Sequence, residues 1–213
     1  MSLQLYFSPG ACSFVPHVGL EAAGAPFEPK LVKLHKGEQR TAEYLAMNPN
    51  GQVPVLVVDG RPLTQIVAIC DYIDCEFPAA ALLPRAAWER SQAISQLAWM
   101  NSTPHTTATR FFFPERYAES EGARLEVKKR AAQEFRGYLE RIDKSVPASG
   151  YWLGERVSFH DAYAFTLLRW GGFAGIDPRA FPGYLAYAER VLQAPPVAAA
   201  AGRERIRLDT YKG

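Results

Sequence analysis

Strand signals occur only before residue 79 of this 213-residue chain, and the segments after it carry helical signals. Short apolar or β-branched runs bounded by Gly, Pro and Asn predict strands at residues 3–7, 27–34, 53–58 and 61–63. Helical patterns lie between and after them, starting at Ser13, Thr41 and Thr64. The order strand, helix, strand, helix, strand, strand, helix predicts that the first domain is of the α/β class.

The rest of the chain is predicted to be all-helical, with helices in residues 87–110, 124–146, 159–170 and 182–193. In the second of these stretches, apolar residues recur at steps of three and four. Three consecutive alanines between two prolines precede this part and are typical of an interdomain linker. We therefore predict an α/β domain at 1–78, a linker at 79–87 and an all-helical domain at 88–213.

Composition and charge argue against several classes of protein. Hydrophobic residues make up 48% of the chain, but no apolar run approaches the length that crosses a bilayer. The net charge is only +2, and the basic residues of the second part are interleaved with acidic ones, so no nucleic-acid partner is expected. The N-terminus lacks the pattern of a secretory signal, so we expect a cytoplasmic protein without membrane contact.

Cys12 is one of three cysteines, and its position sets it apart. The odd number argues against a disulfide framework, and no Cys/His cluster has zinc-ligand spacing, so no metal is expected. Cys12 lies in the turn between the first strand and the first helix, where free N–H groups favour a thiolate. A thiolate attacks electrophiles or disulfides. The alternative interpretation is a small buried side chain.

The Val53-Pro54 step is the second candidate element of a site. A Val-Pro step that enters a strand is able to hold a cis peptide and a sharp bend. Such a bend would leave the backbone N–H and C=O of Val53 free to pair with an extended peptide, in the manner of an added strand. The alternative is that Pro54 simply marks the start of an edge strand.

Together with the order of elements, these segments resemble a known family. Residues 9–13 read Pro-Gly-Ala-Cys-Ser, and residues 48–54 read Asn-Pro-Asn-Gly-Gln-Val-Pro. Over nearly its whole length, the chain resembles the glutathione transferase superfamily, and most of all its bacterial beta class. The resemblance implies a thioredoxin-like first domain, a helical second domain, a homodimer, and glutathione as a co-substrate without a further cofactor.

The resemblance also implies which residues bind the peptide part of glutathione. The backbone of Val53 pairs with the cysteinyl unit, Pro54 holds the bend, and Gln52 lies near one end of the peptide. Lys36, in the loop after the second strand, is a candidate to meet the glycyl carboxylate.

For the chemistry, the resemblance places Cys12 within reach of the glutathione sulfur, with which it is able to form a mixed disulfide. Tyr6 and Ser13 flank Cys12, and either hydroxyl is a candidate donor to a thiolate. In the helical domain, Asn101 matches a family position. His105 falls a turn early, so a role in the site and a polar interface role both stay open. Pro104 is expected to kink the helix there.

One step departs from the family pattern. Relatives have an acidic residue followed by Ser, Gly or Asn at the start of the third helix, and these bind the γ-glutamyl end. This chain has Gln65 and Ile66 there. The Gln65 carbonyl still accepts from the ammonium but lacks charge, and the Ile66 N–H remains available to a carboxylate. We therefore expect weaker glutathione binding or a shifted ligand.

Three functions follow as hypotheses. The first is conjugation of glutathione to a hydrophobic electrophile. The second is glutathione-dependent thiol–disulfide exchange through Cys12. The third is a non-catalytic binding protein that retains the fold.

A structural motif is also predicted: Ser158 and Asp161 have the spacing of a capping box at the start of a helix.

Overall fold

The computed structural model describes residues 1–212 and begins with a four-stranded sheet. Its strands are β1 (Leu3–Phe7), β2 (Glu28–Leu31), β3 (Val55–Val58) and β4 (Arg61–Thr64). They lie in the order β2-β1-β3-β4, with β1 parallel to β2 and antiparallel to β3, and β3 antiparallel to β4. The α/β first domain predicted from the sequence is confirmed.

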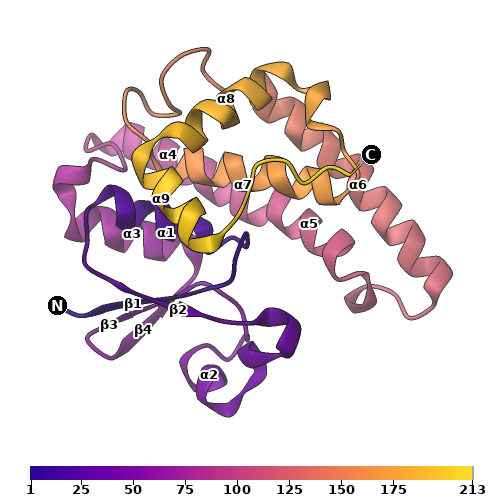
Figure 1. Cartoon of the computed structure of the whole chain (residues 1–213), viewed down its shortest axis with the longest axis horizontal. Coiled ribbons are helices and arrows are strands. Elements are labelled where there is room, and N and C mark those ends of the chain that lie inside the picture. The colour runs from indigo at the N-terminus through magenta and orange to yellow at the C-terminus, as the bar shows by residue number, and fades with distance from the viewer. Residues whose placement is uncertain (213) are drawn as a thin grey trace.

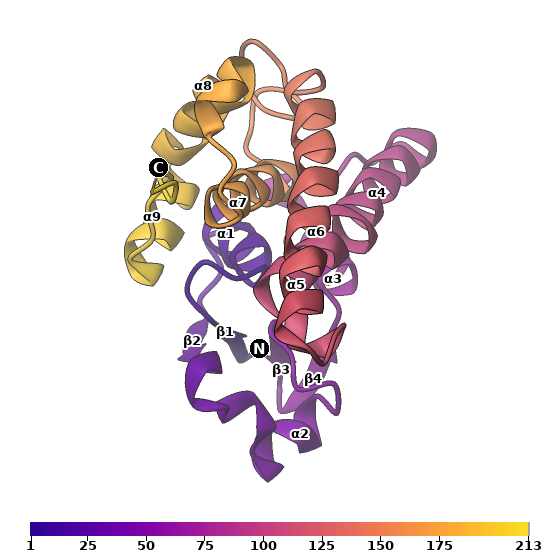
Figure 2. The ribbon, with the colours of Figure 1, turned by 90° about the vertical axis from the view of Figure 1, so that its right-hand side faces the viewer.

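Helices cover both faces of this sheet because side chains alternate along a strand. Leu5 of β1 and Leu56 of β3 face the main core beneath helices α1 (Phe14–Ala22) and α3 (Ile66–Glu76). Val55 and Val57 point to the other face, into a smaller cluster with Tyr44 of helix α2 (Ala42–Met47). In Figures 1 and 2, α1 and α3 therefore lie between the sheet and the helical domain, and α2 lies on the far side.

The second domain is helical, as predicted. Its helices are α4 (Ala87–Ser102), α5 (Pro104–Phe112), α6 (Glu121–Asp143), α7 (Phe159–Phe173), α8 (Pro182–Gln193) and α9 (Pro195–Glu204). Short 3₁₀ turns occur at Leu34–Lys36, Glu38–Arg40, Pro78–Ala80, Pro114–Arg116 and Pro178–Ala180. Helix α7 is buried over nearly its whole length, and α7 and α9 both pack on α1 of the first domain. No helix within residues 1–212 is long and apolar enough to span a membrane.

Three local predictions differ from the structure. The stretch 87–110 is two helices, because Pro104 starts α5 and Thr103 separates it from α4. Thr64 does not cap the third helix: it ends β4, and Gln65 takes the cap position. Helix α9 was not predicted, because Ala-rich sequence after two prolines has little amphipathic pattern. The exact domain bounds and the linker at 79–87 stay predictions.

The predicted capping box at the start of α7 is confirmed, and its carboxylate does more than cap. Asp161 accepts hydrogen bonds from the N–H and the hydroxyl of Ser158, at 2.7 and 2.6 Å. It also accepts from the N–H of Trp152 at 2.9 Å and from the Tyr187 hydroxyl. Asp161 is fully buried, so each of these donors depends on it for a partner.

We predict that Asp161→Ala lowers the free energy of unfolding by about 3 kcal/mol, because several buried donors lose their acceptor. Urea denaturation of the full chain measures this loss. Ser120→Ala is the matched control, because Ser120 caps the exposed start of α6 and its removal costs only ~1 kcal/mol. Equal losses in the two variants would contradict the wider role of Asp161.

Candidate active site

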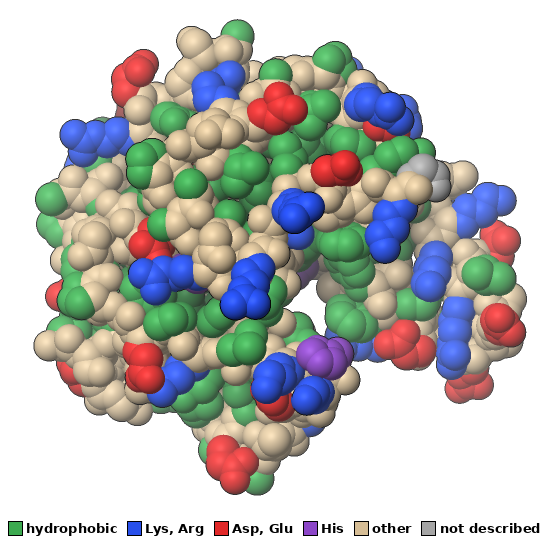
Figure 3. Space-filling view, viewed as in Figure 1, with side chains coloured by type: hydrophobic (Ala, Val, Ile, Leu, Met, Phe, Trp, Pro, Cys, Tyr) green, Lys and Arg blue, Asp and Glu red, His purple; other side chains and the backbone are tan. Residues whose placement is uncertain are grey.

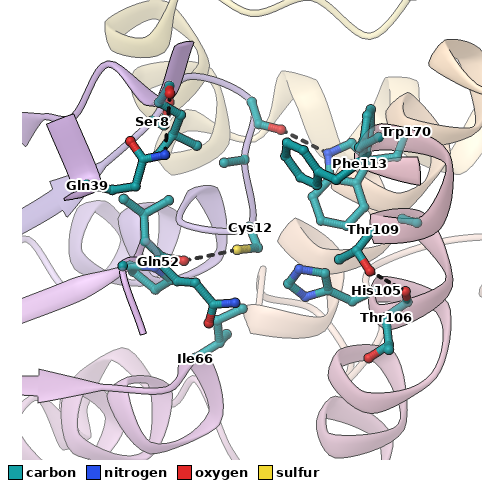
Figure 4. A pocket seen from close by; sticks show the side chains of 18 of the residues that line it. Ser8, Cys12, Gln39, Gln52, Ile66, His105, Thr106, Thr109, Phe113 and Trp170 are labelled. Atoms are coloured by element: carbon teal, nitrogen blue, oxygen red, sulfur yellow. Dashed lines mark hydrogen bonds between the residues drawn. The ribbon is translucent and has the colours of Figure 1, made fainter. Parts of the chain in front are cut away.

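A cleft of about 710 Å³ lies between the two domains and receives side chains from both. Figure 3 shows the hollow from outside, and Figure 4 shows its lining. The first-domain wall is mainly polar and main-chain, and includes Ser8, Gln39, Asn48, Gln52 and Gln65. The helical-domain wall is largely aromatic, with Phe112, Phe113, Tyr117, Trp170 and Phe173. The cleft thus has a polar surface, formed in part by the segment that precedes β3, opposite an aromatic surface.

Cys12 lines the cleft just before α1, and its sulfur points to the first domain. The Cys12 thiol donates to the carbonyl oxygen of Val53 at 3.4 Å, across the turn that precedes β3. Burial raises the pKa of Cys12 to about 12, because desolvation outweighs the backbone N–H groups that favour the thiolate. At this pKa Cys12 is a protonated hydrogen-bond donor at neutral pH, which differs from the thiolate that its position before a helix favours.

His105, in the first turn of α5, lines the opposite wall of the same cleft, facing Cys12 in Figure 4. Its Nδ1 lies 2.8 Å from the Tyr163 hydroxyl, which donates to Oδ1 of Asn101 at 3.0 Å. Because the hydroxyl proton is used on Asn101, Nδ1 of His105 must carry the proton of that contact. Burial lowers the pKa of His105 to about 4, so the ring is neutral at pH 7 and Nε2 is an acceptor.

The segment before β3 and the start of α3 form the polar side of the cleft. Gln52, Val53 and Pro54 line it, and the Val53-Pro54 bond is cis. Gln65 and Ile66 line it too, at the N-terminus of α3, where helix N–H groups favour an anion. The structure thus brings six of the residues predicted to bind glutathione to one cleft, because Asn101 of the helical domain lines it too.

The backbone of Gln65 has an unusual conformation. Its φ is 72°, a left-handed value that side chains other than glycine rarely adopt. Such residues persist where the surrounding structure holds them, and they cluster at ligand sites. In this chain the turn carries the Gln65 side chain into the lining of the cleft while the following N–H groups start α3.

Three predicted site residues do not line the cleft in this structure. Ser13 is fully buried, and its hydroxyl is bonded to the main chain of Ser8. Tyr6 packs its ring edge-on against Tyr44, because its position in β1 faces the α2 side of the sheet. Lys36 is exposed in the turn Leu34–Lys36 and does not line the cleft, while its neighbour His35 does. Their predicted roles therefore have no support from the geometry.

The turn before Cys12 is held by side chains of the helical domain. Glu204, at the end of α9, accepts from the N–H of Gly10 at 2.8 Å and lies 2.8 Å from Nδ1 of His17. Trp170 Nε1 donates to the carbonyl oxygen of Gly10 at 3.0 Å. Gly10 has a φ of 70°, and a Cβ there would lie 2.8 Å from the Arg169 guanidinium. The positive φ therefore favours glycine at this point, and a larger residue would also displace the Arg169 side chain.

Sequence reasoning missed Glu204 and Tyr163 as parts of the site. Glu204 is only 3% exposed, although its neighbours in the sequence are mostly charged. A lone buried acid at the end of an unpredicted helix has no periodic signal in the sequence. Tyr163 is fully buried, and its hydroxyl orients His105. Within residues 1–212, no group of three His, Cys, Asp or Glu side chains is arranged to hold a metal ion.

Comparisons with known proteins agree with this geometry. The family model for the N-terminal domain of glutathione S-transferase matches residues 1–75, and that for the C-terminal domain matches residues 98–195. A glutathione S-transferase of Xanthomonas campestris pv. campestris is 31% identical over 96% of this chain and 100% of its own length.

Two solved structures are similar over almost the whole chain. A glutathione transferase homologue from Sulfitobacter, with bound glutathione, has a TM-score of 0.89 at 27% identity, over 96% of this chain and 99% of that one. A beta-class glutathione S-transferase of Sphingomonas chungbukensis has a TM-score of 0.83 at 36% identity, over 94% of this chain and 98% of that one.

We predict that Glu204→Ala destabilises the chain by about 3 kcal/mol, because two buried partners lose their acceptor. Glu204→Gln should cost less, since its amide oxygen still accepts from the Gly10 N–H. Urea denaturation measures both variants, with Glu189→Ala on the exposed face of α8 as the control. The assignment of Glu204 fails if its alanine variant is as stable as the control.

Proposed function

The chain belongs to the glutathione S-transferase family, and on that premise we propose that it conjugates the thiol of glutathione to a hydrophobic electrophile. The observation that carries the proposal is that Cys12 of the first domain and His105 of the second line one cleft. The polar wall of this cleft suits a peptide, and its aromatic wall suits an apolar acceptor. The Sulfitobacter homologue, whose structure contains glutathione, supports the choice of thiol.

Glutathione enters as a co-substrate and lies along the polar wall. The main chain of Val53 pairs with the cysteinyl unit, as an added strand pairs with a sheet edge. The γ-glutamyl carboxylate accepts from the N–H groups that start α3 at Ile66, and the Gln65 carbonyl accepts from the ammonium. Because Gln65 carries no charge, this end is bound less tightly than an acidic residue would bind it, by ~1–3 kcal/mol.

The glutathione sulfur then lies between Cys12 and His105. When Val53 pairs with the peptide, the Cys12 thiol loses its acceptor and donates instead to the glutathione sulfur. A donor at this point favours the thiolate and lowers the pKa of the bound thiol. Nε2 of His105 accepts a hydrogen bond from the thiol and orients it. With a pKa of about 4, His105 does not keep the proton at pH 7, so the proton passes to solvent.

The bond-forming step uses the sulfur electron pair. In a displacement, sulfur attacks an electron-poor aromatic carbon, a C–S bond forms, and a halide leaves with its bonding pair. In an addition, sulfur attacks the β-carbon of an enone, the π pair moves to the carbonyl side, and the α-carbon takes a proton from water. Both need only a thiolate held beside the acceptor, which is an effect of proximity and orientation.

Thiol–disulfide exchange through Cys12 is the second candidate, because Cys12 faces the place proposed for the glutathione sulfur. Exchange needs the Cys12 thiolate. The pKa of about 12 leaves a very small thiolate fraction of Cys12 at pH 7, which favours conjugation over exchange.

We predict that the purified chain binds glutathione and conjugates it to 1-chloro-2,4-dinitrobenzene. Calorimetry measures binding, and absorbance of the dinitrophenyl thioether measures turnover. The uncharged Gln65 predicts that this binding is weaker than with an acidic residue at the γ-glutamyl end, by ~1–3 kcal/mol. No heat of binding at millimolar glutathione would defeat the proposal and favour a non-catalytic protein.

We also predict that Cys12→Ala lowers kcat/KM for conjugation about tenfold, in proportion to the loss of one donor to the thiolate. Losing the donor raises the pKa of the bound thiol, so the rise of rate with pH should move to higher pH. Cys12→Ser keeps a donor and should stay close to the native profile. If both variants lose conjugation equally, a donor at this position is not what the reaction needs, and the donor role of Cys12 is wrong.

A further inference from the structure

The cleft has a positive charge that no neighbouring acid balances. Among its lining residues within the described chain there is no Asp or Glu. Arg116, in the 3₁₀ turn after α5, lines the cleft, and its side chain forms no ion pair in residues 1–212. An unpaired guanidinium at the edge of an apolar surface binds carboxylates with charge-assisted hydrogen bonds.

A continuous line of rings joins the reactive end of the cleft to this arginine. The His105 ring lies 4.9 Å from that of Trp170, which lies 5.7 Å from Phe112. Phe112 lies 6.3 Å from Phe113, and the Arg116 guanidinium lies 4.2 Å above the Phe113 ring. The aromatic wall therefore begins at His105, beside the place proposed for the glutathione sulfur. It ends at Phe113, which lies under the Arg116 guanidinium.

A side-chain contact fixes the end of the wall that carries Arg116. The Tyr117 hydroxyl lies 2.6 Å from Oγ1 of Thr109, which ties the turn carrying Arg116 back to α5. Arg116 is thus held near the end of the helix that carries His105, on the same side of the cleft. These rings meet at interplanar angles of 63°, 85° and 53°, so a ligand on the wall contacts ring edges as well as faces. An elongated ligand that packs along them has its two ends in unlike surroundings, one facing sulfur chemistry and the other a cation.

We propose that the electrophile is an extended aromatic acid, with its electron-poor carbon against the glutathione sulfur and its carboxylate on Arg116. This inference rests on the proposed function and adds the class of its second substrate. In the reaction, the thiolate sulfur forms a bond to the β-carbon of an aromatic enone. The π bond breaks, its electron pair moves to the enolate, and water supplies the proton to the α-carbon.

The test compares two acceptors that differ only in charge: 4′-carboxychalcone and its 4′-carboxamide. The measured quantity is the ratio of their kcat/KM values, followed by loss of enone absorbance at saturating glutathione. The native chain should prefer the carboxylate, and Arg116→Gln should lower this preference about tenfold, as loss of one charge-assisted contact does. Added salt should also lower it in the native chain, because the contact lies at the edge of the cleft.

Arg110→Gln is the matched control. It removes the same charge from α5, but Arg110 is paired with Glu134 of α6 and does not line the cleft. The control should keep the native ratio. An equal fall in both variants would assign the effect to net charge and overturn the inference.

Other outcomes separate the inference from the proposed function. If Arg116→Gln raises the KM for glutathione and leaves the acceptor ratio unchanged, Arg116 binds glutathione and the inference is overturned. A native ratio near one, with turnover of 1-chloro-2,4-dinitrobenzene intact, overturns the inference alone. If no acceptor is turned over at all, the proposed function fails, and the inference fails with it.

Discussion

The main chain of Gly10 is bonded on both sides by the helical domain: its N–H donates to Glu204 and its carbonyl accepts from Trp170. These two hydrogen bonds join residues that lie far apart in the chain, and they fix the turn that carries Cys12. They also fix the distance between the walls of the cleft, because Trp170 lies beside His105 on the aromatic side. The site is therefore a property of the docked domains, and neither domain alone would hold it.

Burial sets the protonation states of Cys12 and His105, which face each other across the cleft. It raises the pKa of Cys12 to about 12 and lowers that of His105 to about 4, so both are neutral at pH 7. One is then a donor and the other an acceptor for a thiol placed between them. A helix N-terminus alone would favour a Cys12 thiolate, but its effect of ~1 kcal/mol is smaller than the desolvation of a charged sulfur.

The two walls of the cleft differ in the kind of ligand that each suits. The first domain offers main chain at Val53 and a helix start at Ile66, which suit the amide and carboxylate groups of a peptide. The helical domain offers rings and, at their far end, Arg116. In the proposed function, the choice of electrophile therefore depends on the helical domain, and the choice of thiol depends on the first domain. Substitutions in one wall are therefore able to change the ligand bound there without loss of binding at the other wall.

The sequence by itself determined the order of the elements in the first domain, the helical class of the second, the capping box at Asp161 and the family, because these depend on local periodicity, turn residues and motifs. It also identified Cys12, Val53 and His105 as candidates. Only the tertiary structure decided that Cys12 is a protonated donor, that Ser13 is buried away from the cleft, and that Glu204 supports the site. Desolvation and contacts between residues far apart in the chain set these properties, and neither leaves a local pattern in the sequence.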